Sequence, residues 1–223
     1  MPEFIAALRS LLDADRVKTV IELGAHLGQS TQALLQAFPN ADIHCFEPNP
    51  ETRAKLNQRF RAELRVYVYP EIVTDHCGVE TLNCNLDPAT DSIFNPHSEA
   101  KRWIEQQAQP MQRQRRIEGL SITIDQFMQS LSLDKLDLLF SDIQGAELRA
   151  LSGAKQALER KAISVIFAEL LYVPIYEGQA NQEDVVGFLA KYGYKLRGRY
   201  NEAYDLQGTG QLMWADGVFT PGD

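Results

Sequence analysis

Short apolar runs rich in β-branched residues alternate with longer amphipathic stretches along most of this chain. Four of these runs lie at 18–23, 42–46, 136–140 and 162–170, and a stretch with helical spacing of apolar residues follows each of them. A parallel sheet produces this alternation, because helices connect its successive strands and cover both of its faces. We therefore expect an α/β fold, with a mostly parallel central sheet and helices on both faces.

The two ends of the chain add a helix and a strand pair to this sheet. Segment 1–17 contains an expected N-terminal helix, with apolar residues at helical spacing over 4–12. Residues 194–204 and 211–220 are extended runs separated by a glycine-containing turn at 206–210, which predicts an antiparallel pair at the C-terminus. Further helices are expected at 28–38, 48–60, 145–160 and 181–192 and after Asp125, and further extended segments at 64–68 and 71–73.

Residues 76–121 interrupt the regular pattern. Asn, Asp, Pro, Gly and Gln are frequent there, and no hydrophobic period persists for long. We expect an elaborated insertion between core strands, inside a single domain that spans 1–223, because neither an internal repeat nor a flexible linker divides the chain. The basic segment 101–116 within the insertion is typical of a solvated helix face.

The composition excludes several classes of protein. Lys and Arg total 22 and Asp and Glu total 30, so the formal net charge of −8 argues against a dedicated nucleic-acid binder. A chain of 223 residues with 44% hydrophobic residues can bury one core without disulfide bonds. The three cysteines, Cys45, Cys77 and Cys84, have neither an even number nor C-x-x-C spacing, and this indicates a reducing compartment.

Targeting and membrane signals are the next feature of the sequence. The N-terminus shows no apolar signal core, and the most apolar stretch, 162–176, is broken by Glu169 and Pro174. That stretch is also shorter than the roughly 20 residues of a membrane-spanning helix. We therefore expect a cytoplasmic protein with no membrane segment and no nucleic-acid partner.

The strongest local signal is VIELGAHLGQST at 20–31, a buried strand that runs through a glycine turn into a helix. Gly24 is expected to allow a sharp turn with room for a ligand beside it, and Gly28 to let the helix approach the sheet closely. The helix N-terminus would present free N–H groups to a ligand. Glu22 at the strand end would attract an ammonium group, which a pyrophosphate-binding loop does not require.

A second acidic residue, Glu47 in CFEPNP, ends the next strand. A carboxylate at this place can accept hydrogen bonds from both hydroxyls of a ribose, as it also does in dinucleotide-binding folds. Dinucleotide loops usually carry G-x-G-x-x-G, whereas this loop has Gly24, His26 and Gly28 without a third glycine. The two acids around one glycine turn therefore predict a nucleoside-containing cofactor.

The chain resembles the FkbM family of class I S-adenosylmethionine-dependent methyltransferases. The resemblance rests on IELGAHLGQST, CFEPNP, SITIDQF, LLFSDIQGAELRALSGA, the strand that ends at Glu169, YVPIYEGQ and QLMWADGVF, which together extend from about 18 to 219. It implies a Rossmann-like fold and S-adenosylmethionine as the cofactor, with S-adenosylhomocysteine as its product. It also implies methylation of a hydroxyl oxygen on a small molecule, sugar or glycan, with the insertion at 76–121 near the acceptor.

The resemblance assigns cofactor contacts residue by residue. The loop from Gly24 together with Glu22 would line the methionine part, Glu47 would hold the ribose, and Asp75 would lie near the adenine. The expected cofactor-binding residues are Glu22, Gly24, Ala25, His26, Gly28, Gln29, Ser30, Glu47, Pro48, Asp75 and Asp142.

Two positions depart from the family pattern. His26 stands where the family commonly has Asn in the glycine loop, and both residue types tolerate left-handed backbone conformations. Ser141 stands where Lys often precedes the Asp at the end of the fourth strand. The absence of that lysine removes a positive charge beside Asp142.

Two acidic residues are the candidates for catalysis. Asp142 follows the strand at 136–140, where open α/β sheets place their ligands, and we expect it near the cofactor as the candidate base. The alternative is that Asp142 caps the following helix, with Glu147 completing the cap. Glu169 ends a buried strand, so it either contacts the acceptor or forms a salt bridge or hydrogen bond with a neighbouring loop.

The expected acceptor contacts lie further along the chain. Tyr172, Tyr176 and Glu177 occupy a proline-containing loop, where aromatic faces and hydroxyls suit a sugar-like acceptor, although they could equally be packing residues. Asp216 in the last strand reaches the acceptor pocket by resemblance or is an inward-facing structural residue. The basic segment 101–116 would, in its functional interpretation, recognise an anionic acceptor such as a phosphorylated or nucleotide-linked sugar.

Three further possibilities remain open at the level of sequence. The histidines show no spacing typical of a metal site, so no metal ligand is expected, although several acids approach one sheet edge and leave a divalent cation possible. A nicotinamide-dependent oxidoreductase or epimerase would carry a Tyr-x-x-x-Lys pair, whereas Tyr172 and Tyr176 are followed at the fourth position by Tyr176 and Ala180. A non-catalytic module that binds S-adenosylmethionine is the remaining alternative.

Overall fold

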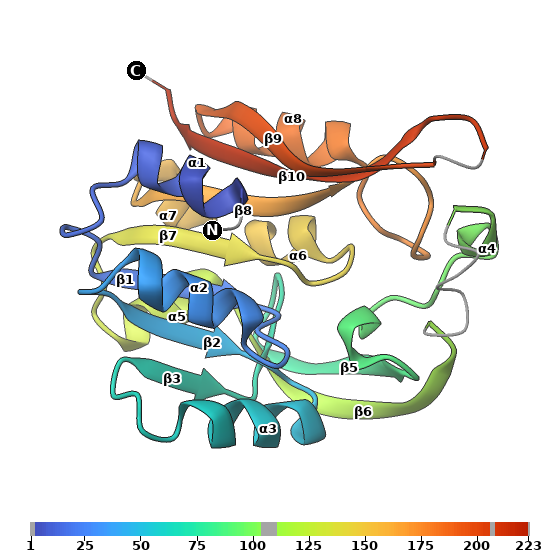
Figure 1. Cartoon of the computed structure of the whole chain (residues 1–223), viewed down its shortest axis with the longest axis horizontal. Helices are drawn as coiled ribbons and strands as arrows, with labels where there is room; N and C mark the ends of the chain where they lie inside the picture. Colours follow the sequence, from blue (N-terminus) through green and yellow to red (C-terminus); the bar gives the residue numbers. More distant parts are fainter. Residues whose placement is uncertain (1–2, 104–110, 206–207, 223) are drawn as a thin grey trace.

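A seven-stranded sheet forms the centre of the computed structural model, which describes residues 3–103, 111–205 and 208–222 (Figure 1). Its strands are β1 (Thr19–Leu23), β2 (Asp42–Phe46), β3 (Val66–Tyr69), β7 (Leu136–Ser141), β8 (Ile163–Leu171), β9 (Tyr194–Tyr204) and β10 (Leu212–Pro221). They lie in the order β3-β2-β1-β7-β8-β10-β9. The predicted turn at 206–210 falls partly outside the described residues, which omit Leu206 and Gln207.

The strand directions confirm the predicted sheet. β1 pairs in parallel with β2 and β7. Further out, β2 pairs in parallel with β3, and β7 pairs in parallel with β8. β10 pairs antiparallel with both β8 and β9, which closes one edge of the sheet. The chain proceeds from β1 to β3 on one side and resumes at β7 on the other. The sheet therefore has a topological switch point between β1 and β7, where open α/β sheets bind ligands.

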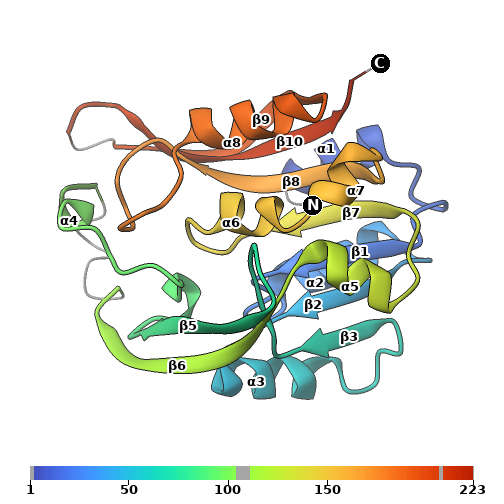
Figure 2. The same cartoon turned by 180° about the vertical axis from the view of Figure 1, so that it is seen from behind.

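Helices cover both faces of this sheet, as the alternating sequence predicts. One face packs against α1 (Glu3–Leu11), α2 (Gln29–Ala37) and α3 (Pro50–Phe60). The other face packs against α5 (Ile124–Ser130), α6 (Glu147–Ser152), α7 (Lys155–Glu159) and α8 (Gln182–Lys191), which Figure 2 presents towards the viewer. None of the helices within the described residues is long and apolar enough to cross a membrane.

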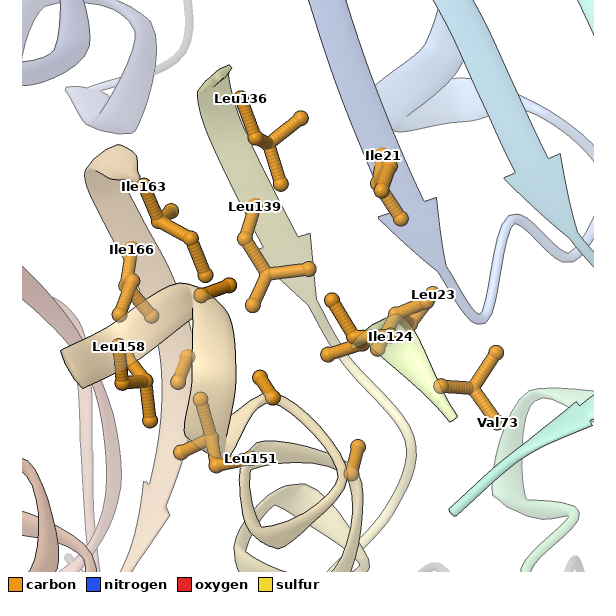
Figure 3. Packing of buried hydrophobic residues seen from close by; sticks show 14 of the residues in the cluster. Ile21, Leu23, Val73, Ile124, Leu136, Leu139, Leu151, Leu158, Ile163 and Ile166 are labelled. Atoms are coloured by element: carbon orange, nitrogen blue, oxygen red, sulfur yellow. The ribbon is translucent and has the colours of Figure 1, made fainter. Parts of the chain in front are cut away.

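The larger hydrophobic core lies between the sheet and the helices α5 to α8. Ile21 and Leu23 of β1, Leu139 of β7 and Ile166 of β8 all belong to it, with Ile124 of α5 beside Leu23 and Leu158 of α7 beside Ile166 (Figure 3). These side chains are almost fully buried. Each such residue contributes about 1.5–3 kcal/mol by removing apolar surface from water. This packing holds the ends of β1, β7 and β8 in fixed relative positions.

The insertion contains regular structure that the sequence did not reveal. A second sheet has the order β4-β6-β5, formed by β4 (Ile72–Val73), β5 (Gly78–Asn85) and β6 (Arg113–Ile122), and η1 (Pro88–Thr90) and α4 (Ala100–Trp103) lie between β5 and β6. Most side chains at the start of β6 are exposed, so no hydrophobic alternation marks the strand. The predicted helix face at 101–116 is wrong, because 101–103 alone are helical, 113–116 belong to β6, and 104–110 lie outside the described residues.

The single helix predicted at 145–160 is also wrong, because α6 and α7 are separate. A side-chain atom on Gly153 would overlap the carbonyl oxygen of Thr74, so the backbone at Gly153 packs directly against the neighbouring segment. The Asp125 carboxylate then accepts hydrogen bonds from the backbone N–H groups of Gln156 and Ala157, at 2.8 and 2.9 Å. These bonds satisfy the first N–H groups of a new helix and end the previous one.

Gly28 precedes α2 and has a different role from the predicted one. Its φ of +81° is in the left-handed region, and a Cβ atom there would overlap the ring of Phe60 and approach Leu56 at 2.8 Å. Both of these side chains belong to α3. The glycine therefore allows α3 to pack against the start of α2, rather than α2 to approach the sheet.

We predict that Gly28→Ala lowers the free energy of unfolding by about 2 kcal/mol or more, because it adds both steric overlap and left-handed strain. The matched control is Gly187→Ala. Gly187 is an exposed residue of helix α8, and no atom lies within 4 Å of the position that its Cβ would take. That control should raise the free energy of unfolding by about 0.5–1 kcal/mol. Urea denaturation of both variants measures the difference, and equal stability of the two would contradict the packing described for Gly28.

Candidate functional site

A cavity of about 270 Å³ lies at the carboxyl ends of β1, β2 and β7, next to the switch point of the sheet. The loops that follow these three strands form most of its wall, and the segment after β5 covers it from the opposite side. The residues that line it are Leu23, Gly24, Ala25, His26, Gln29, Ser30, Phe46, Glu47, Pro48, Glu71, Ile72, Val73, Leu82, Pro88, Ala89, Asp91, Ser92, Ile93, Asp142, Ile143, Gln144 and Ala146.

The loop after β1 has the tight backbone that its glycine predicts. Gly24 has a φ of +79°, and a Cβ atom there would overlap the carbonyl oxygen of Asp142. The backbone that follows β7 thus occupies the position of a Cβ atom at residue 24, and Gly24 lines the cavity on its open side. His26 has a φ of +48°, which confirms the left-handed conformation expected at this position.

Glu47 connects the loops after β1 and β2. Its Oε2 accepts a hydrogen bond from the backbone N–H of His26 and its Oε1 accepts one from Asn49, both at 2.9 Å. Burial raises the pKa of the Glu47 carboxyl to about 7. An ionised carboxylate has about four acceptor positions, so two remain to receive hydroxyl groups from the cavity.

Glu22 lies beneath the loop rather than in the cavity lining. Its Oε2 accepts hydrogen bonds from the Thr31 hydroxyl at 2.6 Å and from the Cys45 thiol at 3.3 Å. Its Oε1 is buried without a hydrogen-bond partner among the described residues. Burial raises the pKa of Glu22 to about 7. The structure therefore does not bring Glu22 together with the cavity-lining residues, and Gly28 is likewise absent from the lining.

The acid that lines the first cavity after β3 is Glu71, and not Asp75, which we expected near the adenine. Asp75 does not line the cavity and instead forms an ion pair with Arg149, with 2.8 Å between Nε and Oδ2. Burial opposes ionisation of Asp75, but hydrogen bonds from His76 and Arg149 outweigh it and lower its pKa to about 2. Glu71 does line the cavity, and its Oε2 is buried without a hydrogen-bond partner in the described part of the chain.

A second cavity, of about 380 Å³, adjoins the first and shares Ala89, Asp142 and Gln144 with it. Its remaining walls come from the segment after β5, the end of β8, the loop after β8 and the start of β10. The residues that line it are Asp87, Ala89, Thr90, Met111, Asp142, Gln144, Glu169, Leu171, Ile175, Tyr176 and Trp214.

Asp142 stands where the two cavities meet. Its Oδ1 accepts a hydrogen bond from Gln144 Nε2 at 2.8 Å, and the Tyr176 hydroxyl donates to Gln144 Oε1 at 2.6 Å. The carboxylate reaches solvent through the cavities, yet the protein that surrounds it raises its pKa above the usual value. Asp142 does not cap α6, because Ala146 occupies the N-cap and Glu147 accepts the hydrogen bond from the Ile143 N–H.

Glu169 and Asp216 face each other across the β8–β10 pairing. Asp216 Oδ2 accepts a hydrogen bond from Asn201 Nδ2 at 2.7 Å, and burial raises the pKa of Asp216 to about 7. Glu169 lines the second cavity, and its side chain forms no salt bridge or hydrogen bond with another residue in the described ranges. Burial, and then the charge of Asp142, raises the pKa of Glu169 well above its usual value.

Of the other expected acceptor residues, only Tyr176 lines a cavity. The hydroxyl of Tyr172 accepts a hydrogen bond from Arg199 at 3.4 Å, and exposed Glu177 accepts one from Asn95 at 3.2 Å. Sequence reasoning missed Gln144 and Trp214, although both lie inside quoted motifs, LLFSDIQGAELRALSGA and QLMWADGVF. Their proximity in sequence to Asp142 and Asp216 was the signal that could have identified them.

Metal binding finds no structural support in the described residues. No group of three or more His, Cys, Asp or Glu side chains is arranged there to hold a metal ion. Glu147, Asp142 and Asp216 instead each accept a hydrogen bond from a backbone N–H group or a side-chain amide.

Comparison with known proteins gives consistent matches. The model of the methyltransferase FkbM domain matches residues 22–196. The 2-O-methyltransferase NoeI of Sinorhizobium fredii (strain NBRC 101917 / NGR234) is 24% identical over 182 residues, which cover 78% of this chain and 71% of NoeI.

Solved structures with the same fold are methyltransferases of low sequence identity. A Listeria monocytogenes protein assigned as an S-adenosylmethionine-dependent methyltransferase has a TM-score of 0.55 at 9% identity, covering 98% of this chain and 97% of that protein. The N-terminal domain of EvdMO1, studied in the presence of S-adenosylhomocysteine and D-fucose, has a TM-score of 0.50 at 10% identity, covering 97% of this chain and 82% of that one. These likenesses establish a class I methyltransferase fold, as predicted.

Glu22 gives a test of the buried acids at the site. Its pKa is raised from 4.5 to about 7, so the folded state holds this proton more tightly than the unfolded state and Glu22 lowers stability as pH rises through this range. We predict that Glu22→Gln gains about 2–3 kcal/mol in unfolding free energy relative to the wild type between pH 5 and pH 8. Urea denaturation at both pH values measures this change.

The control for this measurement is Glu118→Gln, which alters an exposed carboxylate on β6. Its stability difference from the wild type should stay constant over the same pH range. A Glu22→Gln variant that follows the pH dependence of the wild type would show that Glu22 does not retain its proton in the folded state.

Proposed function

This chain belongs to the FkbM methyltransferase family, and we propose that it transfers a methyl group from S-adenosylmethionine to a hydroxyl oxygen of a sugar or a similar small molecule. The observation that carries the proposal is the position of Asp142, which lines both adjoining cavities. A carboxylate at this junction can reach the cofactor on one side and an acceptor hydroxyl on the other. The likeness to NoeI, a 2-O-methyltransferase, supports oxygen as the acceptor atom.

The first cavity fits the cofactor. Glu47 has acceptor positions free for the ribose hydroxyls, and the unpartnered Oε2 of Glu71 can accept a hydrogen bond from the adenine amino group. The N-terminus of α2 carries no side-chain cap, so the N–H groups of Gln29 and Ser30 are available for the cofactor carboxylate. When bound, S-adenosylmethionine supplies a methyl group activated by its sulfonium charge.

The residues of the second cavity act on the acceptor. Asp142 Oδ2 receives the hydroxyl proton as the acceptor oxygen gains the methyl group, while Gln144 holds Oδ1 in place. A raised pKa makes Asp142 a stronger base than an ordinary carboxylate. Glu169, which keeps its proton because its pKa is raised, can donate a hydrogen bond to a second oxygen of the acceptor. Tyr176 fixes Gln144, and Trp214 offers an apolar wall.

We expect S-adenosylhomocysteine to raise the melting temperature of the wild type by roughly 5–10 °C at 100 times its dissociation constant, and NAD to leave it unchanged. Glu71→Gln should weaken S-adenosylhomocysteine binding about tenfold, because a neutral amide oxygen accepts a weaker hydrogen bond than a carboxylate oxygen does. Isothermal titration calorimetry measures the affinity directly. The matched control, Asp75→Asn, should leave the affinity unchanged, since Asp75 lies outside the cavity.

A shift with NAD alone would favour the oxidoreductase alternative over methyl transfer. If Asp75→Asn weakened S-adenosylhomocysteine binding and Glu71→Gln did not, the adenine would lie where the sequence motif alone places it.

We predict that Asp142→Asn lowers kcat by about a hundredfold or more, because it removes the proton acceptor while retaining the side-chain shape. Methyl transfer from radiolabelled S-adenosylmethionine to a panel of sugars measures kcat, and calorimetry with S-adenosylhomocysteine checks that cofactor binding persists. Asp134→Asn, an exposed substitution before β7, is the control and should keep full activity. Full activity of Asp142→Asn would exclude the proposed base, and turnover by no form of the protein would favour a non-catalytic module.

A further inference from the structure

Two arginines on β6 converge on one neutral oxygen atom. Arg113 Nη1 donates a hydrogen bond to Asn95 Oδ1 at 3.2 Å, and Arg116 Nη2 donates to the same atom at 3.3 Å. Arg116 Nε also donates to Asn83 Oδ1 at 3.0 Å. Both guanidinium groups are exposed, and each carries a positive charge. Two positive charges are therefore held side by side by amide oxygens.

An irregularity in the strand pairing brings these arginines to the same face. Asn85 is opposite Arg113 and Cys84 is opposite Arg115, so Gln114 is an extra residue in β6. The extra residue places Arg113 and Arg116 on one side of the strand and Arg115 on the other. Arg115 forms an ion pair with Glu51 of α3, with 2.9 Å between Nη2 and Oε1. The bulge thus separates a paired arginine from two that lack a carboxylate partner.

Neither Arg113 nor Arg116 forms an ion pair with any carboxylate in the described part of the chain. The Asn95 side chain that binds both arginines also contacts one acid. Its Nδ2 donates a hydrogen bond to Glu177 Oε2, on the side of the amide group opposite the arginines. The two positive charges repel each other because they lie close together. The chain has a net charge of −8, yet none of its described carboxylates neutralises this pair. An external anion would relieve this repulsion.

The arginine pair lies at the edge of the second cavity. Met111, two residues before Arg113, and Tyr176, the residue before Glu177, both line that cavity. The backbone N–H of Glu177 donates to the Asn95 carbonyl at 2.8 Å, and Pro96 pairs with Tyr176. Figures 1 and 2 both place the start of β6 and the loop between β8 and α8 on the same side of the molecule. From Tyr176, hydrogen bonds continue through Gln144 to Asp142.

We propose that the acceptor carries a phosphate group, which Arg113 and Arg116 bind at the rim of the second cavity while the reacting hydroxyl lies beside Asp142. The inference rests on the proposed function and names the substrate class of the same site as a sugar phosphate or a nucleotide-linked sugar. Guanidinium groups bind phosphate oxygens through paired, charge-assisted hydrogen bonds. Asn95 is a positioning residue that aligns the two arginines.

The distribution of charge within the second cavity supports this orientation. Asp87 and Asp142 line the cavity, so a phosphate inside it would meet carboxylates. Sugar hydroxyls, in contrast, can donate to and accept from such groups. The phosphate therefore belongs at the rim and the uncharged sugar ring inside. This arrangement selects which end of the acceptor enters.

The test compares Arg113→Gln/Arg116→Gln with Arg115→Gln, which changes the charge of the same strand on its opposite face. Calorimetry with glucose 1-phosphate and with UDP-glucose, in the presence of S-adenosylhomocysteine, should show binding to the wild type that the double variant loses by at least tenfold and Arg115→Gln retains. Asn95→Asp, which inserts a carboxylate between the two arginines, should weaken binding as well. S-adenosylhomocysteine affinity should be the same in all four proteins.

The two ligands distinguish a single phosphate from a nucleoside diphosphate as the recognised group. Methyl-transfer assays then compare free glucose with the better ligand, and KM for the phosphorylated acceptor should rise at least tenfold in the double variant while KM for glucose stays constant. Equal binding of both phosphorylated ligands by all four proteins, or no binding by the wild type, would overturn the inference. If the wild type did not bind S-adenosylhomocysteine, the proposed function itself would be overturned.

Discussion

The close approach of the backbones that follow β1 and β7 is the constraint on which the site depends. Asp142 N–H donates to the Leu23 carbonyl at 3.1 Å, and only a glycine at position 24 leaves room for the Asp142 carbonyl oxygen. One loop then carries His26 to Glu47, and the other carries Asp142 to Gln144 and Tyr176. Both cavities are built outward from this single contact, which is why they share Asp142.

Burial of acidic groups is the energetic counterpart of this geometry. Glu22, Glu47, Glu147 and Asp216 all have pKa values raised to about 7 or 8 because the protein removes them from water. Such groups lower stability at neutral pH, since the folded state must release protons that it holds more tightly than the unfolded state does. The apolar core between β1, β7, β8 and the helices α5 to α8 offsets this cost. The fold therefore buries these four carboxyl groups at a cost in stability that the core outweighs.

The sequence predicted the central sheet, the glycine turn and the acids at strand ends, because these depend on local patterns. It did not predict the strands β5 and β6, since most side chains of β6 are exposed and the buried half of β5 includes the polar residues Asn83 and Asn85. The family resemblance placed Asp75 near the adenine, whereas Glu71, which follows β3 and lines the first cavity, carried no pattern that singled it out. The break at Gly153 and the bulge at Gln114 arise from contacts with distant segments, which no local pattern contains.

The second cavity is acidic inside and has two arginines at its rim. These opposite charges orient a bound acceptor, which neither end of the cavity could do alone. Carboxylates inside the second cavity attract hydroxyl donors but repel anions, whereas the arginine pair at the rim attracts anions. An acceptor that carries both kinds of group gains from each contact in only one direction of entry. In the proposed acceptor complex, the acidic interior excludes phosphate from the position beside Asp142, and Asp142 remains free to accept the hydroxyl proton. The chain as a whole is negatively charged, so the arginine pair is a local region of opposite sign. In the proposed complex, this pair distinguishes acceptors that carry a phosphate group from acceptors that do not.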